Sequence, residues 1–176
     1  MFDRDSFTVQ EWGEIISAPT AVGALVVTAD VSGPIGLVKE FKAIMNSMKE
    51  FVTANAANSP LMEALQNYMM TKPTAEEEAE MKKWADEQKE EMGANKPETP
   101  EEMKQLVRDR TGETLSLLRS KGATDNDIDL FKQMMIAVAE NVADASKEGG
   151  FMGFGGTRVS AAEESILAQI RSELGA

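Results

Sequence analysis

Five glycines, two phenylalanines and an arginine lie close together between Gly149 and Arg158. These residue types suit a binding loop, because glycine lets a ligand approach the backbone, phenylalanine offers an apolar surface and arginine binds anions. The loop also precedes an expected helix start at Ser160, where backbone N–H groups can hold a phosphate or a carboxylate. Three alternatives follow: an anion site, a partner-binding loop, or a turn that packs two helices together.

The spacing within this loop matches neither of the two common phosphate-binding patterns. A Walker-type loop needs a lysine followed by serine or threonine after its glycines, whereas Gly156 is followed by Thr157 and Arg158. The dinucleotide pattern G-x-G-x-x-G is not matched either, and we expect no strand before the loop. We therefore favour a structural turn anchored by Phe151 and Phe154, ahead of a partner-binding loop and an anion site.

Asp30 is a further candidate because it is the one charged residue in the apolar stretch 15–38. An acid in such a stretch must lie at a helix end, pair with a cation, or have a shifted pKa. The Ser-Gly-Pro sequence at 32–34 favours the helix end. If Asp30 were buried, Arg158 or Lys39 would be its counter-ion. The candidate ligand- or partner-binding residues are Phe151, Phe154, Gly155, Gly156, Arg158 and Asp30.

Two acidic patterns bear on metal binding. Three aspartates alternate over residues 125–129, but an EF-hand loop that began at Asp125 would need glycine and glutamate where Leu130 and Ile136 stand. These acids are better placed in the first turn of a helix, where they face the positive end of its dipole. The acids at 76–80 are typical of a solvated charge run. We therefore expect no metal and no cofactor.

The composition narrows the chemistry further. The 176 residues include no cysteine and no histidine, which removes thiolate catalysis and the usual general base at neutral pH. The formal net charge of −12 disfavours nucleic-acid binding. The first residues show no basic leader followed by an apolar run, so we expect a cytoplasmic protein. A non-catalytic role is favoured.

Helix signals dominate the whole chain, which predicts one all-α domain over residues 1–176. Capping boxes, in which a threonine or serine is followed three residues later by glutamate, begin at Thr8, Thr74, Thr99 and Ser160. The helix that follows Thr8 is expected to end before Pro19, because the residue preceding a proline avoids the α region. We predict a single bundle of six to eight helices.

Within that bundle, we expect a buried apolar helix over about 20–30, where small residues such as Gly23 let another helix approach closely. Apolar residues then recur at helical spacing from Leu37 to Val52, including Phe41, which predicts an inward-facing stripe. The segment 72–99 is strongly acidic and is expected to form an exposed, loosely docked helix at about 75–92.

The last quarter of the chain resembles a known family. The stretch AVAENVADASKEGG followed by RVSAAEESILAQIRSELG is similar to the helix–loop–helix of TerB-like tellurite-resistance helical domains. The resemblance implies a bacterial, stress- or membrane-associated helical scaffold. Those domains usually carry an acidic Asp-Gly turn and an associated metal site, whereas this chain has Gly-Gly-Thr-Arg at 155–158. We therefore carry over no functional residue.

The sequence leaves several functions open. The leading hypothesis is a soluble, non-catalytic interaction or scaffold protein that acts through a protein partner or as a homo-oligomer. One alternative is a module that binds a small apolar or lipid-like ligand near Gly23, Phe151 and Phe154. Another is a peripheral membrane protein that inserts residues 20–38. An enzyme that uses only carboxylates and arginine is the remaining one, although no acid pair can be nominated.

Overall fold

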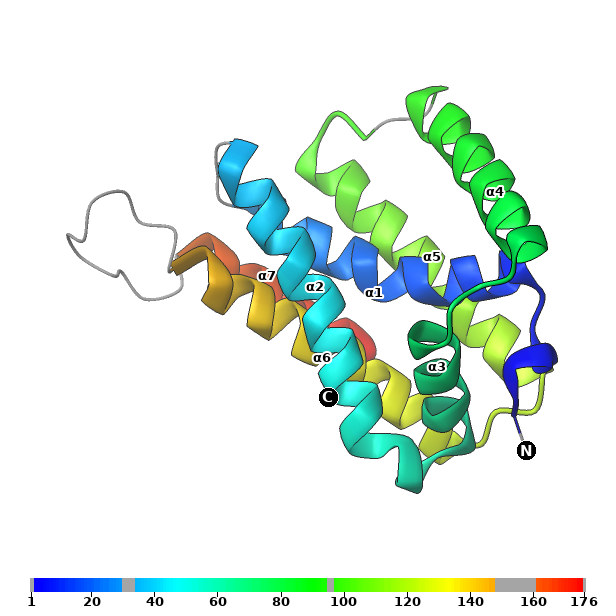
Figure 1. The fold of residues 1–176 in the computed structure, drawn as a ribbon. Helices are drawn as coiled ribbons and strands as arrows, with labels where there is room; N and C mark the ends of the chain where they lie inside the picture. The colour runs from blue at the N-terminus through cyan, green and yellow to red at the C-terminus, as the bar shows by residue number, and fades with distance from the viewer. Residues whose placement is uncertain (1, 30–33, 95–96, 148–160, 176) are drawn as a thin grey trace.

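The chain folds as an all-α bundle in a computed structural model that describes residues 2–29, 34–94, 97–147 and 161–175. Seven α-helices and no strands occur in these ranges, which confirms the predicted fold class (Figure 1). The helices are α1 Val9–Ala29, α2 Pro34–Asn55, α3 Pro60–Met70, α4 Ala75–Ala94, α5 Pro100–Ser120, α6 Asp125–Lys147 and α7 Ala161–Leu174. Two short 3-10 helices, Arg4–Ser6 and Ala56–Asn58, precede α1 and α3.

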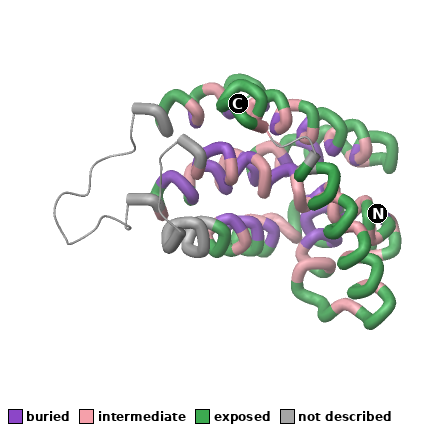
Figure 2. Tube along the Cα trace, turned by 90° about the horizontal axis from the view of Figure 1, so that it is seen from above, coloured by how far each residue is buried: buried purple, intermediate pink, exposed green. Residues whose placement is uncertain are grey.

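Helix α1 is the central element of the bundle. It packs against α2, α4, α5, α6 and α7, and its buried residues recur every three or four positions. These residues are Trp12, Ile15, Ala18, Val22, Leu25 and Val26. Buried residues lie on the facing sides of the helices and exposed residues on the outside (Figure 2). The predicted buried apolar helix is confirmed, but it begins at Val9 rather than near residue 20.

The expectation that the first helix ends before Pro19 is wrong, because α1 continues through this residue. A proline inside a helix removes one backbone hydrogen bond and costs about 3 kcal/mol. Hydroxyl groups bond the carbonyls of the preceding turn: Thr20 Oγ1 donates to the Ile16 oxygen and Ser17 Oγ to the Glu14 oxygen, each at 2.8 Å. Burial of a whole helix face, at about 1.5–3 kcal/mol for each large side chain, outweighs the local cost.

Gly23 lets two helices approach α1 closely, as its small size predicts. A Cβ atom at this position would lie 2.6 Å from Cγ1 of Ile44 on α2 and 3.2 Å from Cγ1 of Val138 on α6. Any larger side chain would push one of these helices away.

The three capping boxes that fall in the described residues form as predicted. The hydroxyls of Thr8, Thr74 and Thr99 each accept the backbone N–H three residues later at 3.2 Å. The glutamates at those later positions accept the threonine N–H in return. Gly122 follows α5 with a φ of +91°, in the left-handed region that glycine adopts at low cost. The fourth box begins at Ser160, outside the described residues.

One part of the predicted inward stripe is wrong. Phe41 on α2 is 58% exposed, although it lies two turns from the fully buried Met48 on nearly the same helix face. The period of the stripe is correct at Ile44, Met48 and Val52, which are buried, but the stripe does not extend to Phe41. Sequence periodicity identifies a face without fixing how far along the helix the face is covered.

Candidate functional site

The candidate residues nominated from the sequence lie outside the part of the chain that the structure describes. These candidate residues are Phe151, Phe154, Gly155, Gly156, Arg158 and Asp30. The described residues do form a hollow between α1, α4 and α5, which we call the acidic cleft.

One wall of the acidic cleft is α4, which stands at one edge of the molecule and packs against α1 (Figure 1). The contact depends on a glycine: an ideal Cβ on Gly13 of α1 would lie 2.8 Å from Cζ3 of Trp84. Real Cβ atoms do not approach other atoms this closely, so the indole ring reaches α1 because position 13 has no side chain. Gly13 and Trp84 together set the distance between the two helices.

Polar and aromatic contacts hold the first turns of α4. Arg4 donates to Oε1 of Glu77 through Nη2 at 2.8 Å and through Nε at 3.1 Å. The same guanidinium lies 5.0 Å from the ring centre of Tyr68, which stacks on Trp12 at 4.6 Å. Burial raises the pKa of Tyr68, and the charge of Arg4 opposes that rise. This cluster fixes one end of α4 beside the N-terminus of α1.

The acidic cleft itself opens further along α4 and has a volume of about 270 Å³. Its four carboxylates and single guanidinium give the lining a formal charge of −3. The lining residues are Glu14, Ser17, Trp84, Gln88, Glu91, Leu106, Asp109, Arg110, Glu113 and Thr114. The one cation, Arg110, donates from Nη2 to Oε1 of Gln88 at 3.2 Å rather than to a carboxylate of the lining.

Two buried donors on the α4 contact have no hydrogen-bond partner. They are Nε1 of Trp84 and Nη1 of Arg4, and no other buried side-chain nitrogen or oxygen in the described ranges is unpaired. An unsatisfied buried donor costs about 1–3 kcal/mol. The seam between α4 and the rest of the bundle is therefore less well satisfied than the core, and one of the two donors belongs to a residue that lines the acidic cleft.

This combination of groups suits binding of an organic cation. Carboxylates attract an ammonium or guanidinium group, and a tryptophan ring adds a cation–π contact of about 0.5–2 kcal/mol. The site is less suited to a metal ion. Among the described residues, no three or more potential acidic ligands lie close enough together to hold one. None of the described helices is long and apolar enough to cross a bilayer.

Comparison of the chain with protein-family models, curated proteins and solved structures found no match. The resemblance to TerB-like domains stays a prediction, since nothing found bears on it.

Sequence reasoning missed the acidic cleft for an identifiable reason. Its carboxylates come from α1, α4 and α5, and they are separated by up to 99 positions between Glu14 and Glu113. Trp84 lies in the acidic helix that the sequence predicts over about 75–92. The residue that its ring packs against could not be predicted, because the position of a glycine in the sequence does not indicate which side chain will contact it.

Proposed function

We propose that this protein is a non-catalytic interaction protein that binds a basic segment of a partner protein in the acidic cleft. The observation that carries the proposal is the cleft lining, which has a formal charge of −3 and a tryptophan wall. Lysine and arginine side chains of a partner would meet the carboxylates, and their aliphatic stems would pack beside Trp84.

The charge of the whole chain supports a hetero-partner over a second copy. The chain carries 30 acids and 18 basic residues, and α4 alone has eight acids and three lysines. Two copies that met through α4 would bring like charges together, which is unfavourable. A basic partner would be steered toward the same surface, so its association would be fast at low ionic strength.

The test is a binding titration with a synthetic lysine-rich peptide, followed by fluorescence. The protein has two tryptophans, and Trp12 is 1% exposed, so a change on binding reports mainly on Trp84. We expect saturable binding that weakens as salt rises, because the Debye length falls from about 10 Å at 0.1 M to about 3 Å at 1 M. A glutamate-rich peptide of the same length is expected not to bind.

Paired variants separate the acidic cleft from the general charge of the protein. The double variant Glu14→Gln/Glu113→Gln removes two lining carboxylates and is expected to weaken binding by roughly threefold to tenfold. The control Glu50→Gln/Glu63→Gln removes two exposed carboxylates outside the cleft, on α2 and α3, and is expected to leave affinity nearly unchanged. Equal losses in the two double variants would contradict the proposal, as would the absence of binding to the unmodified protein.

A further inference from the structure

A second hollow lies on the opposite face of α5. It is a groove of about 280 Å³ between α5 and α7, and Val22 of α1 contributes to its lining. Its lining is mainly aliphatic, in contrast to the acidic cleft. The lining residues are Val22, Val107, Arg108, Thr111, Gly112, Leu115, Ile170, Glu173 and Leu174. We call it the aliphatic groove.

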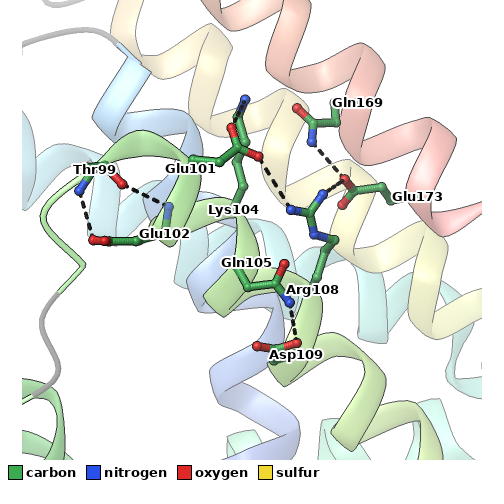
Figure 3. A network of polar contacts seen from close by, with 9 residues as sticks. All are labelled: Thr99, Glu101, Glu102, Lys104, Gln105, Arg108, Asp109, Gln169 and Glu173. Atoms are coloured by element: carbon green, nitrogen blue, oxygen red, sulfur yellow. Dashed lines mark hydrogen bonds and ion pairs between the residues drawn. The ribbon is translucent and has the colours of Figure 1, made fainter.

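The charged residues at the rim of the aliphatic groove neutralise one another. Arg108 contacts Oε1 of Glu173 through Nη1 at 3.1 Å and Oε1 of Glu101 through Nη2 at 3.6 Å (Figure 3). Lys104 lies 3.4 Å from the second oxygen of Glu101, and Gln169 donates to Glu173 at 2.8 Å. The two cations and two carboxylates of this rim sum to zero. An ionised ligand would have to compete with these pairs and would gain no unpaired counter-charge.

Gly112 keeps the aliphatic groove open. It lies within α5, and a Cβ atom added there would meet nothing within 4 Å. Glycine is less favourable than alanine inside a helix, and here no close-packed neighbour explains it. This contrasts with Gly13 and Gly23, where a Cβ would strike a neighbouring side chain. The missing side chain at position 112 leaves width between α5 and α7.

We propose that the aliphatic groove binds a small, neutral, mainly aliphatic molecule. The volume of about 280 Å³ is just below the usual range for small-ligand sites, about 300–1,000 Å³, and is too small for a partner helix. The paired rim favours an uncharged ligand, and the Thr111 hydroxyl in the lining is a neutral polar group that can bond a ligand hydroxyl. The aliphatic groove is separate from the acidic cleft, so this proposal does not depend on the proposed protein partner.

The probe for this proposal is 1-octanol, titrated into the full chain and followed by methyl NMR. We expect saturable shifts concentrated in the methyl groups of Val107, Leu115, Ile170 and Leu174. Octanoate has the same chain length and carries a charge, so it is expected to bind more weakly. Tighter binding of octanoate than of octanol would overturn the neutral class of ligand.

The matched variants are Gly112→Leu and Gly93→Leu. Both glycines lie in helices with open space beside them, but Gly93 is on α4 and outside the aliphatic groove. Each methylene group of octanol that a new side chain excludes from the aliphatic groove weakens binding by a factor of about four. Gly112→Leu is therefore expected to weaken octanol binding by roughly tenfold or more, and Gly93→Leu to leave it unchanged.

Gly112→Ala covers the case in which the leucine variant fails to fold, and it is expected to weaken octanol binding by a factor of about four at most. No saturable shift with octanol would overturn the proposal. So would shifts that map away from the groove, or equal losses at positions 112 and 93.

Discussion

Asp127 is a buried acidic residue whose side chain connects two helices by hydrogen bonds. It is 1% exposed and lies in the first turn of α6. One of its oxygens accepts from the Ser59 hydroxyl and from the Leu61 N–H at 3.4 Å. The other accepts from the backbone N–H and hydroxyl of Thr124, at 2.9 and 2.7 Å. A single carboxylate therefore joins the N-termini of α3 and α6.

Acid should remove the stabilisation that Asp127 provides. Burial by itself raises the pKa of Asp127, but hydrogen bonds from Ser59, Thr124 and Leu61 outweigh it and the pKa is lowered. A carboxyl with a lowered folded-state pKa contributes stability that is fully present above its unfolded value of about 3.9 and is lost as pH falls through the folded value. Asp127→Asn is expected to cost about 1–3 kcal/mol at pH 7 and progressively less below about pH 4.

Urea unfolding at a series of pH values measures this difference. Asp129→Asn is the matched control, because Asp129 is exposed on the same helix and should change stability little. A cost for Asp127→Asn that stays constant from pH 7 to about pH 2 would contradict the role assigned to the ionised carboxylate.

Gly112 and Gly13 have opposite surroundings, so replacing each by alanine should change the stability of the protein differently. Gly112→Ala adds a methyl group to open space and is expected to stabilise the protein by about 0.5–1 kcal/mol, since alanine is favoured inside a helix. Gly13→Ala places its methyl group against the Trp84 ring and should give no such gain, although the helix propensities are the same. Thermal unfolding measures both, and an equal gain at the two positions would show that the Trp84 contact is not close.

At the scale of elements, α4 differs from the other helices in how it is held. Its exposed face is acidic, its core contribution is small, and it docks through Trp84, Met81 and Glu77. Elements with few buried contacts open at a lower free energy than the core. We therefore expect α4 to be displaced more readily than the other described helices, and such a displacement would change the shape of the acidic cleft.

Hydrogen exchange should detect this difference. In Gly13→Ala the indole of Trp84 must move away from α1, so amide protection over Ala75–Ala94 is expected to fall while protection of α6 is kept. Gly112→Ala is the control and should leave both regions protected. Equal loss of protection in α4 and α6 would mean that α4 unfolds only with the whole bundle.

The positions of the helices could be predicted from the sequence more accurately than the contacts between them. Threonine–glutamate capping boxes locate the starts of α1, α4 and α5 because the signal is local and has a fixed spacing. The helix end predicted before Pro19 was wrong, because the free energy gained by burying one face of α1 outweighs the local cost of a proline inside the helix. The acidic cleft could not be predicted, since its lining is assembled by packing among three helices and by the absence of a side chain at Gly13.

At the scale of the whole molecule, net charge is the dominant long-range effect. An excess of 12 acids makes the compact state repel itself at neutral pH. A few exposed ion pairs, such as Arg171 with Glu140, oppose this repulsion weakly. We therefore expect the unfolding temperature to rise as sodium chloride increases to about 0.5 M, because screening reduces the repulsion. A fall over the same range would mean that the ion pairs dominate.

The location of a bound basic peptide tests the proposed interaction most directly. Two-dimensional NMR resolves the indole N–H of Trp84 from that of Trp12, which is buried and donates to the Arg4 oxygen at 2.9 Å. On addition of the lysine-rich peptide, we predict a saturable shift of the Trp84 indole and of the Gln88 side-chain amide, with Trp12 nearly unchanged. Shifts confined to the outer face of α4 or to other helices, with the Trp84 indole unmoved, would contradict binding in the acidic cleft.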